Sequence, residues 1–153
     1  MKLLLVAPLL LLGLAPAQAQ THQHTMTNVG QEVWKDGPPF LPKGAQSTVL
    51  YGDPSKEGMF VLRLKLPANY KIPPHTHSVD EIVTVISGQA KVGMGKTADE
   101  KGTTAVKAGG VITMGPGMEH YVLIEEPTVV QLSTRGPFNI RYVNEVDDPR
   151  KTQ

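Results

Sequence analysis

Hydrophobic and polar residues alternate along most of the chain beyond residue 45, and this pattern predicts short β-strands. In MFVLRLKLP, residues 59–67, large apolar side chains occupy every second position from Phe60, and Arg63 and Lys65 lie between them. A period of two residues is typical of a strand that buries only one face. Further strand-like segments follow at 47–51, 81–88, 89–95, 102–110, 110–117, 120–127, 128–138 and 139–144.

Glycine and proline separate these segments and favour turns over helices. The chain contains 15 glycines and 13 prolines, and no segment beyond Trp34 has the 3.6-residue period of an amphipathic helix. Short strands repeated every 8 to 12 residues or so are typical of an all-β sandwich or barrel. We expect residues 81–88 and 89–95 to form a hairpin around Gly88. The sequence shows no internal repeat and no second domain, so we predict a single domain.

The first 19 residues have the three-part pattern of a secretory signal peptide. Lys2 supplies the positive start, an apolar run extends over residues 3–14, and the sequence AQA at residues 17–19 offers a cleavage site. A membrane anchor is the alternative, but the apolar run is too short and too interrupted to span roughly 30 Å of hydrocarbon. We therefore expect a secreted or periplasmic protein without a membrane segment after cleavage.

The chain is expected to divide into four segments. These are a signal peptide at 1–19, an N-terminal extension at 20–44, a β-barrel at 45–145 and a frayed tail at 146–153. The extension begins with the polar sequence QTHQHTMT, which has no periodicity. His22 and His24 lie in it, and we expect no metal site there because a lone His-x-His in a polar segment rarely forms one.

Charge and composition exclude several classes of partner. One of the 15 lysines and arginines is Lys2, so the exported chain keeps 14 basic residues against 14 acidic ones, and no basic stripe stands out. Binding to nucleic acid or to an anionic membrane surface is therefore not expected. Cysteine is absent, so disulfides do not stabilise the fold and no thiolate can bind a metal.

The segment IPPHTHSVDEIVTVISG, residues 72–88, contains the most specific chemistry of the sequence. His75 and His77 are two residues apart, so they point to the same face if the chain is extended. A bend at SVD would bring the carboxylate of Glu81 to the same point. Downstream, His120 follows a GPG turn and begins an apolar strand, so three nitrogens and one oxygen can converge on one ion.

These two segments resemble the two sequence motifs of the cupin family. The first motif is G-x5-H-x-H-x3–4-E-x6-G, and four residues match it at every spacing: His75, His77, Glu81 and Gly88. Asn69 stands in place of the leading glycine, and asparagine also tolerates a left-handed backbone conformation.

The second cupin motif, G-x5-P-x-G-x2-H-x3-N, is matched more loosely. Gly109, Gly117 and His120 agree with it. Gly115 occupies the proline position, with a proline one residue later, and Ile124 replaces the final asparagine. That asparagine position is not a ligand position, so the departure concerns packing more than metal binding.

The resemblance covers roughly residues 45–143 and implies a jelly-roll β-barrel. It further implies one divalent transition metal, held at the mouth of the barrel by His75, His77, Glu81 and His120. Three imidazoles and one carboxylate suit Mn, Fe, Co, Ni, Cu or Zn, and the identity of the ion stays open. The alternative is a barrel held by ordinary packing and without metal, since some cupins lack one.

Two functions are open at this point. The protein is either a metal-dependent enzyme, dioxygenase-, isomerase- or decarboxylase-like, that acts on an unidentified small molecule, or a non-catalytic barrel that binds a small ligand or only the metal. Acid and base candidates besides the four ligands are few. Arg63 and Gln131 are candidates for further pocket residues, and exposure to solvent is the alternative for both.

The resemblance also implies a homodimer that forms by pairing of edge strands. Residues 28–36 and 138–143 are the candidate edges, and pairing within one chain is the alternative. Four further side chains are expected to pack in the core: Tyr51, Met94, Met114 and Tyr121.

Overall fold

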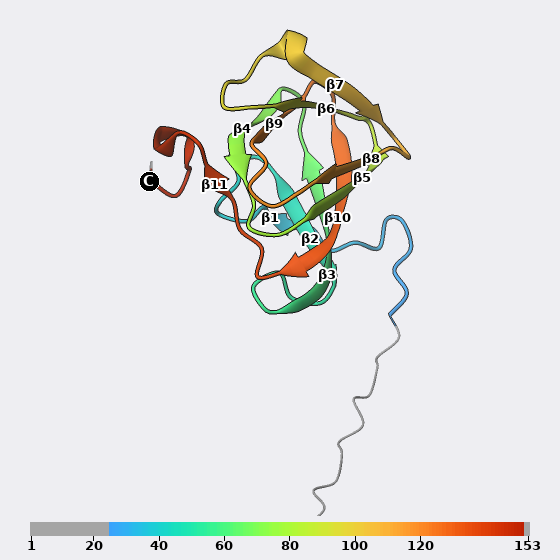
Figure 1. Ribbon diagram of the computed structural model, residues 1–153. Coiled ribbons are helices and arrows are strands. Elements are labelled where there is room, and N and C mark those ends of the chain that lie inside the picture. Colours follow the sequence, from blue (N-terminus) through green and yellow to red (C-terminus); the bar gives the residue numbers. More distant parts are fainter. Residues whose placement is uncertain (1–24, 152–153) are drawn as a thin grey trace, which may run out of the picture.

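A computed structural model describes residues 25–151 of the chain (Figure 1). Within these residues the chain forms eleven β-strands and two short 3₁₀ helices. The strands are β1 (Lys35–Asp36), β2 (Gln46–Tyr51), β3 (Gly58–Leu66), β4 (Tyr70–Thr76), β5 (Glu81–Ser87), β6 (Gln89–Met94), β7 (Thr103–Lys107), β8 (Val111–Met114), β9 (His120–Ile124), β10 (Thr128–Gly136) and β11 (Arg141–Tyr142). The helices are η1 (Glu100–Gly102) and η2 (Glu145–Asp147). Neither helix in this part of the chain has the length and the hydropathy needed to span a bilayer.

The strands form two antiparallel sheets that face each other across a common core (Figure 1). The six-stranded sheet has the order β1-β2-β3-β10-β5-β8, and the five-stranded sheet has the order β11-β4-β9-β6-β7. No backbone ladder joins the two sheets within residues 25–151, so side-chain packing holds them together. The predicted all-β jelly-roll fold is confirmed.

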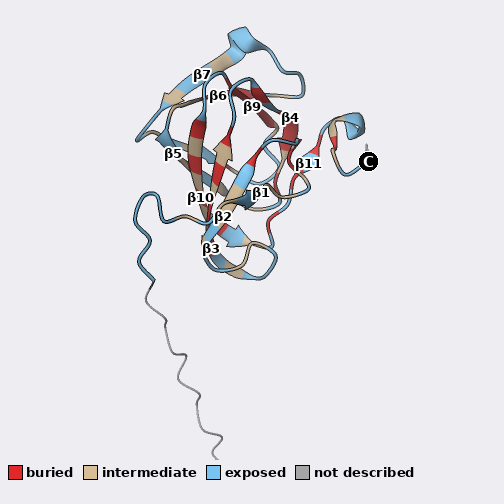
Figure 2. Ribbon diagram, turned by 180° about the vertical axis from the view of Figure 1, so that it is seen from behind, coloured by how far each residue is buried: buried red, intermediate tan, exposed pale blue. Residues whose placement is uncertain are grey.

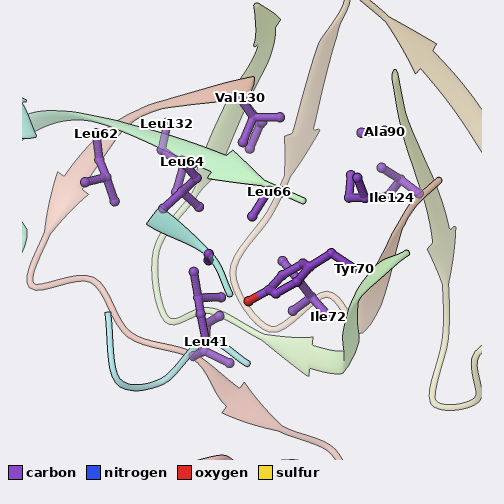
Figure 3. Packing of buried hydrophobic residues seen from close by; sticks show 14 of the residues in the cluster. Leu41, Leu62, Leu64, Leu66, Tyr70, Ile72, Ala90, Ile124, Val130 and Leu132 are labelled. Atoms are coloured by element: carbon purple, nitrogen blue, oxygen red, sulfur yellow. The ribbon is translucent and has the colours of Figure 1, made fainter. Parts of the chain in front are cut away.

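The alternation of residues on β3 decides which side chains enter the core. Phe60 and Leu64 are buried, whereas Arg63 lies on the outer face of the sheet. β10 pairs with β3 along its whole length, and its Val130 and Leu132 point into the same space as Leu64 (Figure 3). Figure 2 shows that the buried positions lie on strands of both sheets. Each such side chain contributes roughly 1.5–3 kcal/mol when it is fully buried.

The predicted hairpin between residues 81–88 and 89–95 is wrong. β5 pairs with β8 and β10 in the six-stranded sheet, whereas β6 pairs with β7 and β9 in the other sheet. Gly88 has a φ of 75°, and the chain passes there from one sheet to the other. A side chain at this position would also overlap Thr128. The sequence pattern identifies both strands, but it does not specify their neighbours.

The sequence pattern does not predict β4, because Pro73 and Pro74 interrupt it. In the structure β4 pairs with β9, and the register of this ladder shifts at the two prolines. Proline has no backbone N–H to donate to a ladder, so an irregularity is expected at this place. Just before the strand, Asn69 has a φ of 61°, the left-handed conformation that asparagine tolerates.

Two of the four side chains expected in the core lie at the surface. Met114 and Tyr121 are buried as predicted. Met94 is 48% exposed and Tyr51 is 61% exposed, and each is the last residue of its strand. A register shift in the ladder of β2 and β3 places Tyr51 opposite Val61, on the outer face of the sheet.

Both ends of the described chain are held by contacts within the same chain. β1 and β11 each lie at one edge of a sheet, where they pair with β2 and β4, respectively, and β8 and β7 form the other two edges. The homodimer therefore stays a prediction. In the described part of the predicted tail, buried Asp148 accepts two hydrogen bonds from the guanidinium of Arg150, and the division of the chain into four segments stays a prediction. The predicted signal peptide, His22 and His24 lie outside the described residues.

Candidate metal centre

Three strands bring the four candidate ligands to the same end of the fold. His75 lies on β4, His77 follows directly after this strand, and His120 begins β9. His75 and His120 are direct partners in the ladder between β4 and β9. Glu81 begins β5 in the opposite sheet. The four side chains therefore meet between the two sheets.

The ring nitrogens of the three histidines form a compact buried group. One nitrogen from each ring lies within 4.8 Å of the other two, a spacing that could hold a metal ion. Glu81 Oε1 lies 3.6 Å from His77 Nε2, and Glu81 Oε2 lies 3.2 Å from His120 Nε2. The histidines are only 2–5% exposed, and the side chain of Glu81 is 12% exposed. One carboxylate and three imidazoles thus share a site that excludes most solvent.

A backbone carbonyl orients each imidazole at its Nδ1. The three pairs are His75 with Pro73 (2.7 Å), His77 with Asn139 (2.7 Å) and His120 with Met118 (3.0 Å). A carbonyl oxygen can only accept, so each Nδ1 carries the hydrogen and each neutral ring presents a bare lone pair at Nε2. Backbone anchoring of this kind is typical of histidines that hold a metal.

Two of these lone pairs have no donor to accept from. Nε2 of His77 and Nε2 of His120 are buried and have no hydrogen-bond partner in the described part of the chain. The oxygens of Glu81 beside them are acceptors as well. An unsatisfied buried polar group costs about 1–3 kcal/mol, and acceptors that face each other also repel. A cation at their centre would satisfy all of them, so the residues present fit a metal ion.

Burial and the carboxylate set the charges of the site. Burial, helped by the neighbouring His120, lowers the pKa of His75 to about 3, and burial also lowers the pKa of His77. Burial acts in the same direction on His120, but a proton on its Nε2 would face the carboxylate of Glu81, and this raises the pKa of His120. The pKa of Glu81 is lowered, because the imidazoles outweigh the opposite effect of burial. At neutral pH Glu81 is ionised while His75 and His77 are neutral, as metal binding requires.

Two aromatic rings outside the sequence motifs pack against the imidazoles. Phe138 stacks on His77, with ring centroids 4.5 Å apart and an interplanar angle of 21°. The ring centroid of Tyr142, on β11, lies 6.0 Å from that of His75. The sequence reasoning missed both contacts, because they arise where β11 returns to the edge of β4, far along the chain from the histidines.

Two small cavities adjoin the four side chains inside the barrel. One cavity, of about 50 Å³, is lined by Glu81, His120 and ten aliphatic side chains. The other, of about 40 Å³, touches His75, His77 and Glu81 and is otherwise apolar. Since a water needs roughly 10–15 Å³ of such space, each cavity has room for about three or four water-sized groups. The interior next to the site is therefore small and hydrophobic.

Arg63 and Gln131, the other candidates for the pocket, line neither of these cavities. They are partners across the ladder of β3 and β10, and Arg63 Nε donates to Gln131 Oε1 at 3.0 Å. Arg63 Nη1 also pairs with Glu32 at 2.6 Å. The side chain of Glu32 is only 8% exposed. These residues fasten the N-terminal extension to the outer face of the six-stranded sheet.

A family model described as a cupin domain matches residues 62–133, which include all four candidate ligands. The chain belongs to the cupin superfamily. Among curated proteins, none matches the sequence of this cupin.

Solved structures with low sequence identity share the cupin fold of this chain. A putative acetylacetone dioxygenase from Methylibium petroleiphilum PM1 has a TM-score of 0.63 and 18% identity, over 87% of this chain and 90% of its own. The polyketide cyclase RemF from Streptomyces resistomycificus has a TM-score of 0.64 and 19% identity, over 83% and 92%. An oxalate oxidase has a TM-score of 0.51 and 22% identity, over 71% and 60%. At these identities the likeness shows the fold alone.

The site of this cupin also uses residues beyond the matched domain. The match ends at residue 133, before the carbonyl of Asn139 that orients His77 and before Phe138 that stacks on it. The C-terminal segment therefore takes part in shaping the candidate metal centre.

Proposed function

We propose that this cupin is exported, binds one divalent transition metal through His75, His77, Glu81 and His120, and acts as a metal-dependent enzyme on a small molecule. One observation carries the proposal: three histidine nitrogens and a carboxylate converge in one buried place, and Nε2 of His77 and of His120 have no hydrogen-bond partner in the described part of the chain. Such a group is unfavourable without a cation, and nitrogen and oxygen ligands suit the first-row divalent metals.

A dioxygenase-like reaction fits the surroundings of the site best. A bound ion would supply open coordination positions for a substrate and for water or dioxygen. Isomerisation and decarboxylation commonly use an additional acid or base, whereas the two cavities between the sheets offer only aliphatic and aromatic side chains and proline besides the four ligands. An outer pocket of about 480 Å³ at His77 adds the polar residues Thr76, Ser78, Asn139 and Arg141, but no carboxylate and no further imidazole. Proteins named as a putative acetylacetone dioxygenase and as an oxalate oxidase share the fold, which supports the same choice.

A non-catalytic barrel is the second candidate, and the size of the interior favours it. The interior cavities of about 50 and 40 Å³ are far smaller than the roughly 300–1,000 Å³ of ordinary ligand pockets, and the outer pocket of about 480 Å³ touches only His77 of the four ligands. In that case the protein would bind the metal with a very small ligand and release both unchanged.

Protein purified from its natural export compartment should contain about one transition-metal ion per chain and have the mass of residues 20–153.

A chelator should lower the melting temperature by roughly 10 °C. A ligand present at 100 times its dissociation constant stabilises the fold by about 2.7 kcal/mol, and each kcal/mol shifts a domain of this size by roughly 4 °C. Elemental analysis, intact-mass measurement and calorimetry test these expectations, with His77→Ala purified in the same way as the control. Equal, sub-stoichiometric metal in both proteins would show that the site assignment is wrong.

Oxygen consumption separates the enzyme from the non-catalytic barrel. Protein loaded with iron(II) or manganese(II) should consume dioxygen when it is given a small carbonyl or carboxylate compound, with acetylacetone and oxalate as the first two to test. We expect a rate at least about tenfold above that of His77→Ala treated in the same way, because the loss of one ligand weakens metal binding and changes the coordination of the ion. Tight metal binding without oxygen uptake on any of the carbonyl and carboxylate compounds tested would favour the non-catalytic barrel.

A further inference from the structure

The C-terminal segment, residues 137–151, lies beside the candidate metal centre. Figure 1 shows β11 next to β4. We propose that Arg150 is a positioning residue of the metal centre, because it fixes the backbone carbonyl that orients His77. This inference rests on the proposed metal-binding function and adds a residue outside the matched cupin domain.

His77 differs from the other two histidines in how its ring is held. The acceptors for His75 and His120 are carbonyls only two residues earlier in the chain. The acceptor for His77 is the carbonyl of Asn139, 62 residues away, at 2.7 Å from Nδ1. The direction of the His77 lone pair therefore depends on how residues 138–140 are fixed against the barrel.

Arg150 fixes the peptide group that carries this carbonyl. This peptide joins Asn139 to Ile140; its oxygen accepts from His77, and its N–H donates to Asn139 Oδ1 at 2.8 Å. Arg150 Nη1 donates to the same Oδ1 at 3.0 Å, and Arg150 Nη2 donates to the carbonyl of Ile140 at 3.0 Å. One guanidinium thus restrains two successive peptide groups, and the first of them orients the imidazole.

Asp148 holds Arg150 in this position. Nε and Nη2 of Arg150 lie 2.7 Å from the two carboxylate oxygens of Asp148, and the backbone N–H of Arg150 donates to Asp148 Oδ1 at 3.0 Å. Asp148 is only 8% exposed, so the carboxylate is a fixed support. A planar guanidinium with five donors can serve a carboxylate, an amide oxygen and a carbonyl together, which an ammonium group cannot do in this geometry.

Replacing Arg150 with methionine tests the proposal, because Arg150→Met removes the donors and keeps a long side chain. In the metal-free full-length protein, ¹⁵N NMR of the histidine rings should show that the Nδ1 hydrogen of His77 exchanges with water at least about tenfold faster. The signals of His75 and His120 should not change. The affinity for cobalt(II) should fall about tenfold, the lower end of the loss seen when a partner of a metal-bound histidine is removed.

Two further variants complete the experiment. Lys151→Met is the matched control, because Lys151 lies in the same tail and pairs with exposed Glu145 at 2.7 Å; it should behave like the wild-type protein. Asn139→Ala removes the side-chain link but keeps the carbonyl, so it should reproduce the effect on His77 even if Arg150→Met does not fold.

Several results would overturn the inference. An unchanged His77 signal in Arg150→Met, or in Asn139→Ala where Arg150→Met does not fold, would show that Arg150 does not position the ring. An equal change at all three histidines would indicate general loosening of the fold. If the wild-type protein binds no cobalt while the His77 signal alone still responds to Arg150→Met, the metal-binding function fails and the positioning role stands.

Discussion

Replacing His120 with alanine is expected to lower the affinity for cobalt(II) or zinc by about 100- to 1,000-fold. Structural four-ligand sites bind zinc with an apparent free energy of about 10–16 kcal/mol, so each ligand contributes roughly 3–4 kcal/mol. Each 1.4 kcal/mol or so is a factor of ten in affinity. His120 lies opposite His75 in the ladder and 3.2 Å from Glu81, so its loss removes one ligand and a neighbour of two others. Titration against a competing chelator measures the change.

Glu119→Ala is the matched control for this substitution. Glu119 precedes His120 in the chain, and its carboxylate lies 3.6 Å from Lys96 Nζ on the exposed side. This variant should bind metal as the wild-type protein does. Wild-type affinity in His120→Ala, or an equal loss in both variants, would contradict the assignment of His120. Thermal unfolding of the metal-free variants shows whether a loss of affinity reflects a lost ligand or a disturbed fold.

The sequence could predict where the four candidate ligands meet, because short-range geometry places each of them. His75 and His77 are two residues apart on an extended chain, and Glu81 and His120 each stand at the start of a strand. The strands themselves follow from alternation, as on β3. The turn before β4 could be predicted too, since Asn69 is one of the few residue types that adopt a left-handed conformation readily. The resemblance to the cupin motifs was needed to place His120 beside the other three residues, because it lies far from them in the sequence.

The neighbours of the strands could not be predicted in the same way. Alternation on β5 and β6 defines strands and faces, but it contains no information on pairing, so two consecutive strands appeared as a hairpin although they belong to different sheets. Pro73 and Pro74 concealed β4, because the pairing there is irregular. The exposure of Tyr51 likewise depends on a register shift between β2 and β3, which the alternation of residues does not show.

The orientation of His77 is the part of the site that sequence patterns could reveal least. Its acceptor is a backbone carbonyl, and every residue has one, so no side-chain type marks Asn139 for this role. The support from Arg150 comes from a tail that looked frayed because it is short and polar. Both contacts exist only because β11 returns the chain to β4, and long-range pairing of this kind is decided by the whole fold.

Replacing Glu81 with glutamine is expected to change stability and metal binding in opposite directions. In the metal-free protein the carboxylate faces Nε2 of His77 and of His120, and both of these atoms are buried without a donor. A glutamine amide could donate to Nε2 of His120 and carries no charge. At a pH above the pKa of His120, where all three rings are neutral, the free energy of unfolding of the metal-free protein should therefore rise by about 1 kcal/mol, the net value of one hydrogen bond. At a lower pH, a protonated His120 donates to the carboxylate, and this gain should disappear. The affinity for cobalt(II) should fall at least about 100-fold, because a neutral amide is a poor substitute for a carboxylate ligand.

Urea unfolding in the presence of a chelator and a cobalt titration measure the two effects of Glu81→Gln. Asp80→Asn is the matched control, because it neutralises an exposed carboxylate one residue earlier and should alter neither quantity. A loss of metal-free stability greater than about 1 kcal/mol in Glu81→Gln would mean that the carboxylate supports the fold by itself. A gain of about 1 kcal/mol in metal-free stability would mean that the buried acceptors destabilise the metal-free protein and become favourable only when a cation lies between them. A metal-binding site behaves in this way, and a structural ion pair does not.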